Sequence, residues 1–243
     1  MFTMMPASVK ATVSATTFAS YMASLGPRVW VRLDETSGTV AADSSGNGIN
    51  GSYAVDASTL TTAGLLINDS DRGILLSPTG GEVFGVTFPD NTVNVASPYT
   101  LFAIVKPTGQ PPFGTVGCLF QLGQSSGCME VDIIGQPSTY DLRVMRSGQS
   151  QRYITSLALP YNVHHTVALR YTGTGTVLYV DGVAVGSDSG DGGSFVSGLH
   201  RMFHASFGTP EYSHRGYADE GAFFPRALTV AEIQQLTFLA LGV

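Results

Sequence analysis

Short runs that alternate apolar and polar residues dominate the chain from residue 29 onward. In the first run, Val29, Val31 and Leu33 recur at every second position, which is the period of a strand that buries one face. Turn residues separate nearly every later pair of runs. These later runs are residues 73–76, 83–88, 100–106, 118–122, 128–134, 140–146, 166–171, 176–180 and 183–185. The spacing predicts an all-β protein.

The strongest turn signal joins the last two of these runs. Asp181 and Gly182 stand between residues 176–180 and residues 183–185. A two-residue type I′ turn needs positive φ at both central residues, and Asp-Gly is one of the pairs that adopt it readily. The sequence therefore predicts a β-hairpin over residues 176–185.

Helical periodicity precedes the first strand. The apolar positions follow the i, i+3, i+4, i+7 pattern, at Phe18, Tyr21, Met22 and Leu25. The Gly26-Pro27 pair then ends the pattern. We assign residues 1–26 to an N-terminal arm with a short amphipathic helix, and we expect this arm to dock on a neighbouring subunit.

A second helix is predicted at the other end of the chain. Thr229 and Glu232 form a capping box, in which the hydroxyl accepts from a backbone N–H and the carboxylate reaches back to the cap. This predicts a helix over about residues 230–239. Many strands with only two short peripheral helices are typical of a two-sheet antiparallel β-sandwich, or jelly roll, and not of βαβ units. We assign residues 27–243 to this single domain.

Composition narrows the range of partners. Charged residues make up 12% of the 243 residues, and the net charge is −6 without any cluster of Lys or Arg. Nucleic acid and anionic lipid are therefore excluded as principal partners. Residues 1–10 lack the basic start and apolar stretch of a signal peptide, and no run approaches 18 apolar residues. We expect neither secretion nor membrane insertion.

Five stretches of the sequence form a recognisable series, at residues 27–38, 43–51, 99–107, 164–182 and 217–233. In this order they resemble the laminin-G-like branch of the concanavalin-A-like lectin superfamily. The chain departs from the family pattern at Val31, which replaces the second aromatic residue, and at Phe102 and Ile104, which replace the usual Glu and Trp. The resemblance implies a concanavalin-A-like sandwich. It does not name a ligand, because this fold carries lectins, hydrolases and structural modules.

The glycine-rich loop carries a candidate calcium site. Asp43, Ser45 and Asn47 alternate oxygen-bearing side chains ahead of Gly48, which is the opening spacing of a calcium loop. Ala54 stands where an EF-hand needs its bidentate Glu, so this is no EF-hand. The alternative is an Asx-turn, in which the side chains bond their own backbone. The resemblance implies a structural calcium between this loop and a late acidic pair, with the ligands Asp43, Asn47, Asp219 and Glu220.

One strand carries a pattern that is similar to retaining β-glucanases of the same fold. Glu130 and Asp132 lie two residues apart, which places both side chains on one face of a strand. A retaining glycosidase needs two carboxylates about 5 to 5.5 Å apart, as nucleophile and as acid/base. The acid/base position is here Ile134 or Gly135. We therefore expect no catalysis and interpret the pair as a polar strand face or a secondary cation site.

Cysteine and histidine offer weaker signals. Cys118 and Cys128 flank a predicted turn, so either a hairpin disulfide or two buried thiols fits the sequence. His164 and His165 point to opposite faces of a strand and lack partners at metal-ligand spacing. The remaining histidines, which a pH-sensitive contact would use, cluster late in the chain at His200, His204 and His214.

Sugar-binding sites favour exposed aromatic faces beside hydrogen-bonding groups. Trp30 lies in the opening strand, and we predict that it belongs to the core. The candidates for stacking on a sugar are the aromatic residues expected in loops, namely Tyr53, Phe113, Tyr140, Tyr161 and Tyr212.

Three classes of function compete. We expect a non-catalytic, virion-associated structural, decoration or adhesion protein, such as a bacteriophage capsid or tail component. It would be assembled in the host cytoplasm and form a homo-oligomer, with other virion proteins or cell-surface glycans as partners. The absence of a signal peptide favours this class over its first alternative, a secreted carbohydrate-binding module. The second alternative is a degenerate β-glucanase-like glycoside hydrolase. The only cofactor expected is structural Ca²⁺.

Overall fold

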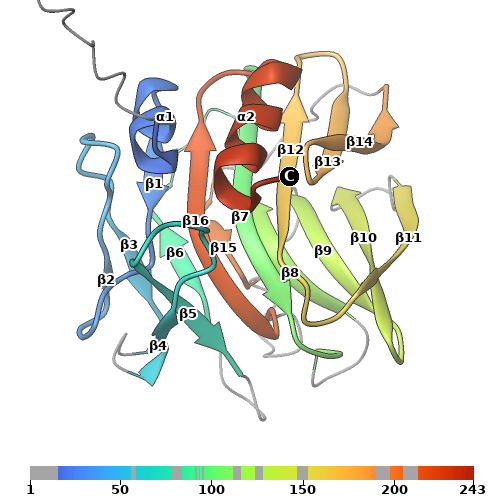
Figure 1. Ribbon diagram of the computed structural model, residues 1–243. Helices are drawn as coiled ribbons and strands as arrows, with labels where there is room; N and C mark the ends of the chain where they lie inside the picture. The colour runs from blue at the N-terminus through green and yellow to red at the C-terminus, as the bar shows by residue number, and fades with distance from the viewer. Residues whose placement is uncertain are drawn as a thin grey trace, which may run out of the picture.

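The computed structural model describes residues 16–55, 59–77, 84–90, 92, 94, 96–111, 116–123, 128–146, 153–189, 198–204 and 213–243. Within these residues the strands form two sheets that stack face to face, and both helices lie on the outer side of one sheet (Figure 1). All pairings between the named strands are antiparallel. The predicted two-sheet antiparallel sandwich is confirmed.

The first sheet, called sheet A, is 8-stranded and carries both helices. Its order is β14-β13-β12-β7-β16-β5-β4, and β1 pairs with β16 beside this path. In this order the strands are Val183–Asp188, Thr176–Val180, His165–Tyr171, Tyr99–Pro107, Gly216–Phe224, Arg72–Leu76 and Thr61–Ala63, with β1 at Val29–Val31.

The second sheet, sheet B, is also 8-stranded, with the order β11-β10-β9-β8-β15-β6-β3-β2. In this order the strands are Tyr153–Pro160, Thr139–Arg146, Met129–Gly135, Val116–Leu122, His200–Met202, Val86–Phe88, Gly51–Tyr53 and Val40–Ala41.

The main core lies between the two sheets, and alternation along each strand builds it. On β7, Leu101, Ala103 and Val105 point into this core, whereas Phe102 and Ile104 point outward into a second apolar cluster. The second cluster lies between sheet A and the helices. Central strands of sheet A are therefore buried on both faces, because the helices cover what a two-layer sandwich would leave in solvent.

The opening strand shows the same effect. All of β1 is buried: Val29 and Val31 face the main core, and Trp30 faces the outer cluster. The sequence predicted a half-buried strand, and this prediction is corrected because its outer face lies under helix α1. Trp30 is a core residue, as predicted.

Helix α1, Phe18–Ser24, begins at Thr17, whose side chain forms a capping box with Ser20. The apolar face of this helix is buried within its own chain, and docking of the arm on a neighbouring subunit stays a prediction. Phe18 packs on Phe102, with ring centroids 6.2 Å apart, and Met22 is fully buried. Residues 1–15 lie outside the described residues.

The hairpin and the terminal helix agree closely with the predictions from the sequence. Asp181 and Gly182 have φ of 49° and 74°, as a type I′ turn requires. Helix α2, Val230–Leu241, starts with the predicted Thr229–Glu232 capping box and ends at Gly242, whose φ is 74°. Neither helix has the length and apolar character needed to span a membrane.

Cys118 and Cys128 are not joined in a disulfide, and both are buried. Cys118 lies opposite Asp132 in the β8–β9 register, whereas Cys128 precedes β9 by one residue. Four residues of strand separate Cys128 from Asp132, about 13 Å at 3.3 Å per residue. Of the two alternatives left by the sequence, the described geometry excludes the hairpin disulfide, because bonded cysteines need Cα atoms within about 7 Å.

Candidate functional site

A β-bulge in β16 creates the most charged site in the described part of the molecule. In the pairing with β7, Asp219 lies opposite Ile104 and Ala222 opposite Phe102, so β16 has one residue more than its partner. Glu220 occupies the bulge with φ of 50°. Adjacent residues on a regular strand point to opposite faces. The bulge instead brings the carboxylates of Asp219 and Glu220 to the same side of the sheet.

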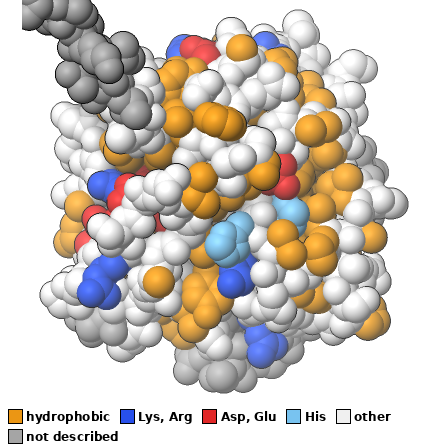
Figure 2. Space-filling view, viewed as in Figure 1, with side chains coloured by type: hydrophobic (Ala, Val, Ile, Leu, Met, Phe, Trp, Pro, Cys, Tyr) orange, Lys and Arg blue, Asp and Glu red, His pale blue; other side chains and the backbone are white. Residues whose placement is uncertain are grey.

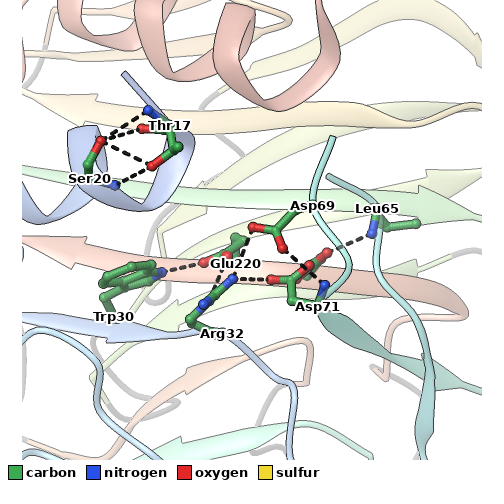
Figure 3. Close-up of polar contacts among 9 residues, drawn as sticks. Thr17, Ser20, Trp30, Arg32, Leu65, Asp69, Asp71 and Glu220 are labelled. Carbon is green, nitrogen blue, oxygen red and sulfur yellow. Dashed lines mark hydrogen bonds and ion pairs between the residues drawn. The ribbon is translucent and has the colours of Figure 1, made fainter. Parts of the chain in front are cut away.

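A third carboxylate joins this pair from the loop before β5. Oxygen atoms of Asp71, Asp219 and Glu220 all lie within 4.8 Å of one another. We call these three residues the acidic cluster. Figure 3 shows Arg32 reaching into it from the chain after β1, next to Trp30. Figure 2 shows acidic and basic side chains close together on the left of this face, where the loop between β4 and β5 runs in Figure 1.

Each carboxylate of the acidic cluster has defined partners. Arg32 donates from Nη2 to Asp71 Oδ2 at 2.5 Å and from Nε to Glu220 Oε1 at 3.2 Å. The Trp30 indole N–H donates to Glu220 Oε2. The backbone N–H of Leu65 donates to Asp219 Oδ2 at 2.6 Å. These contacts tie β1, the β4–β5 loop and β16 together.

The acidic cluster holds three carboxyl groups beside a single guanidinium, that of Arg32. Asp219 and Glu220 are 0% exposed. Burial raises the pKa of Asp219 to about 8, and the charge of Asp71 adds to the rise. Burial and the charge of Asp219 raise the pKa of Glu220 well above its usual value. The site therefore favours any species that neutralises it, either a proton or a bound cation.

Two oxygens of the acidic cluster, Asp71 Oδ1 and Asp219 Oδ1, are buried and have no hydrogen-bond partner among the described residues. A groove of about 380 Å³ reaches Asp69 and Asp71 from the surface. Hard cations bind oxygen ligands of this kind, so the donor set of Asp71, Asp219 and Glu220 fits a calcium ion. The sequence missed Asp71, because only the fold brings the β4–β5 loop beside β16. Arg32 lies in residues 27–38, one of the stretches that carried the family resemblance, and this was the one available signal.

The other two predicted calcium ligands, Asp43 and Asn47, lie in the glycine-rich loop and bond to the backbone there. Asp43 Oδ1 accepts from the backbone N–H groups of Trp30 at 3.1 Å and Ser45 at 2.9 Å, and Oδ2 accepts from Ile49 N–H at 2.9 Å. Asn47 donates from Nδ2 to the carbonyl oxygens of Pro27 and Arg28, both at 3.1 Å. Asp43 thus adopts the Asx-turn alternative. The structure brings together Asp219 and Glu220, but not Asp43 and Asn47 with them.

Sheet B holds the carboxylate pair that is similar to β-glucanases. Glu130 and Asp132 lie on one face of β9, as predicted, and are 2% and 1% exposed. Gln121 donates to Glu130 at 2.8 Å, and Arg143 donates from Nη2 to Asp132 at 2.8 Å. Burial raises the pKa of both, that of Asp132 to about 7. Neither Ile134 nor Gly135, the two alternatives for the acid/base position, supplies a carboxyl group. The pair is buried in a hydrogen-bonded network and not open to a polymer.

Comparison with known sequences decides the family. The sequence profile described as the concanavalin A-like lectin/glucanases superfamily matches residues 80–234. The chain belongs to this superfamily. No curated protein sequence matches it.

Solved structures agree with this concanavalin A-like fold. A sialidase of Trypanosoma rangeli, in complex with a difluoro-KDN compound, aligns with a TM-score of 0.65 and 14% identity over 88% of this chain and 32% of the sialidase. Domain 4 of AbnA, a GH43 extracellular arabinanase from Geobacillus stearothermophilus, in complex with arabinotriose, aligns with a TM-score of 0.61 and 17% identity over 87% of this chain and 98% of that domain. The chain thus spans about a third of the sialidase. At these identities the likeness shows the fold alone.

The aromatic candidates of this concanavalin A-like chain take different positions. Tyr53 and Tyr140 are 5% and 0% exposed and lie in the main core. Their expected role in sugar stacking is corrected, because alternation turns them inward. Tyr161 is half-buried and stacks on Tyr140, with ring centroids 5.7 Å apart. Phe113 and Tyr212 lie outside the described residues.

Proposed function

We propose that this chain is a non-catalytic, lectin-like binding domain for cell-surface glycans. The observation that carries the proposal is the state of Glu130 and Asp132. A retaining glycosidase needs an accessible nucleophile and a second carboxyl group for proton transfer. Here both carboxylates are buried, Arg143 pairs with one of them, and the acid/base position is Ile134 or Gly135, neither of which has a carboxyl group. Membership of a superfamily of lectins and glucanases supports glycan binding as the remaining role.

Two assays with the purified protein test this proposal. We expect binding to at least one glycan on an array of bacterial and plant oligosaccharides. We also expect no release of reducing sugar from laminarin. Hydrolysis of laminarin that is lost in a Glu130→Gln variant would contradict the non-catalytic assignment. An array without any bound glycan would contradict the binding role.

A structural calcium ion is part of the proposal. Asp71, Asp219 and Glu220 would hold it, since two of their buried oxygens lack a hydrogen-bond partner in the described part of the chain. Its role would be to neutralise the acidic cluster and so to fix the β4–β5 loop against β16. It would have no part in any reaction.

Assembly, as in a bacteriophage virion, is the second candidate function, and one observation favours it. The outer face of α2 and the β13–β14 hairpin enclose a groove of about 520 Å³. Val183, Phe238 and Val243 line this groove and are 63%, 54% and 76% exposed. Figure 2 shows hydrophobic side chains on the upper part of the same face, where α2 runs in Figure 1. Exposed apolar surface of this kind is typical of contacts between protein subunits.

The assembly candidate predicts a homo-oligomer in solution. Light scattering would measure its mass, and a Phe238→Lys variant should dissociate it because a buried lysine is costly. Lys replacement of Val40, which is 51% exposed on sheet B, is the control. A monomeric wild-type protein would contradict this candidate.

A further inference from the structure

A second polar groove lies beside the glycine-rich loop and shares no lining residue with the groove at Asp69 and Asp71. Its volume is about 410 Å³. Small-ligand sites usually measure roughly 300 to 1,000 Å³. Among its described lining residues are Arg28, Ile49, Asn50, Pro89, Asp90 and Thr92.

Three polar side chains of this groove are available to a ligand. Arg28 and Asp90 are exposed, and neither takes part in an ion pair among the described residues. Asn50 Oδ1 accepts from Asp43 N–H at 2.9 Å. The oxygen of the Asn50 amide is therefore engaged, and its NH₂ group remains as the donor. The groove thus offers a carboxylate acceptor, an amide donor and a guanidinium donor.

Apolar surface lies beside these polar groups. Ile49 is half-buried against the main core, and Pro89 is exposed at the end of β6. A sugar ring presents C–H groups on one side and hydroxyl groups at its edge, so its binding sites combine apolar contact with a few placed hydrogen-bonding groups. The groove has both components.

Hydrogen bonds fix both walls before any ligand arrives. On one wall, Asp43 accepts from Ile49 N–H, and Asn47 donates to the carbonyl of Arg28. On the other wall, Thr92 Oγ1 donates to the carbonyl of Pro89 at 2.6 Å. A fixed site loses little conformational entropy on binding. The glycine-rich loop, first interpreted as a calcium loop, thereby gains a different task, which is to position this groove.

We infer that this groove is a glycan subsite that takes one or two neutral sugar residues. Asp90 accepts from a pair of sugar hydroxyl groups, and Asn50 and Arg28 donate to hydroxyl oxygens. The formal charges of Arg28 and Asp90 cancel, which favours a neutral sugar over an acidic one. The inference rests on the proposed glycan-binding function and locates it.

An array of neutral and acidic oligosaccharides, with arabinotriose among the neutral ones, first identifies the strongest neutral ligand. Titration calorimetry then measures the affinity of the protein for this ligand. Asp90→Asn and Asn50→Asp are the variants. Asn50→Asp keeps the acceptor for Asp43 N–H, removes the donor and adds a negative charge to the groove. We expect each variant to weaken binding at least tenfold, with an unchanged unfolding temperature.

Asp34→Asn is the matched control, because Asp34 is an exposed carboxylate that does not line the groove. It should bind like the wild type. Wild-type binding that survives in both groove variants would overturn the subsite and leave the proposed function intact. A preference for acidic glycans would overturn the neutral class. Failure of the wild-type protein to bind any glycan would overturn the proposed function itself.

Discussion

The indole N–H of Trp30 donates a hydrogen bond to the carboxylate of Glu220, across 190 positions of sequence. This bond links the first strand to the bulge of β16. A Trp30→Phe variant keeps an aromatic ring in the outer cluster and leaves a buried acceptor without its donor. We expect it to lower the free energy of unfolding by about 1 to 3 kcal/mol. Urea unfolding followed by circular dichroism measures this.

A Tyr179→Phe variant is the control for Trp30→Phe. Tyr179 is buried in the same outer cluster, and its hydroxyl group makes none of the hydrogen bonds described above. The control should cost less than Trp30→Phe. Equal losses would mean that the bond to Glu220 adds nothing beyond the removal of one polar group from this cluster.

Calcium should stabilise the protein through the acidic cluster. A ligand that binds only the folded state at one hundred times its dissociation constant adds about 2.7 kcal/mol. For a chain of this size each kcal/mol raises Tm by roughly 2 to 4 °C. We therefore expect millimolar Ca²⁺ to raise Tm by several degrees, as measured by differential scanning fluorimetry.

An Asp219→Asn variant should abolish this response to Ca²⁺. Asn keeps an acceptor for Leu65 N–H but removes the charge that a cation requires. Asp188→Asn, a carboxylate on the outer hairpin strand β14, is the control and should keep the full response. An equal rise of Tm in the Asp219 variant would show that calcium binds elsewhere.

Acid should destabilise the fold through two buried histidines. Burial lowers the pKa of His200 and of His214 from 6.5 to about 4. Their neutral forms are therefore favoured in the folded state, and their contribution is complete above pH 6.5 and lost as the pH falls towards 4. The loss should be about 2 kcal/mol for each histidine between pH 6.5 and pH 5.

Urea unfolding at these two pH values measures the histidine effect. A His214→Gln variant should show a smaller loss of stability than the wild type over this range. His200→Phe is a second variant, because His200 already packs against Phe223 with ring centroids 6.1 Å apart. If both variants lose as much stability as the wild type, other groups control the acid transition.

Loss of one partner of the Asp132–Arg143 pair should lower the free energy of unfolding more than replacement of both partners. An Arg143→Met variant leaves a buried carboxylate unpaired, which typically costs about 3 to 5 kcal/mol. The pKa of Asp132 is raised to about 7, so the cost should be larger at pH 8 than at pH 6, where the carboxyl group is protonated. A combined Arg143→Met and Asp132→Leu change should recover most of the loss. Urea unfolding at both pH values measures these losses of stability. A double variant that is as unstable as the single variant would contradict this explanation.

Local chemistry in the sequence was sufficient for several elements. The Asp181-Gly182 turn and the capping box of Thr229 and Glu232 were predicted and found, because φ preferences and first-turn hydrogen bonds involve residues close in the chain. Alternation placed Glu130 and Asp132 on one face of β9 for the same reason. The sandwich itself followed from the number of strands and from the family resemblance.

Contacts between distant segments decided the rest. The bulge at Glu220 places the carboxylates of Asp219 and Glu220 beside Asp71. It arises from the register between β16 and β7, and alternation within one strand does not specify that register. Tyr140 lies in the core because its strand turns that face towards sheet A, and the outer face of β1 is buried because helix α1 covers it. The sequence by itself thus determined the strands, turns and caps. Only the tertiary structure decided which side chains meet, because strand register and helix docking minimise exposed apolar surface over the whole chain.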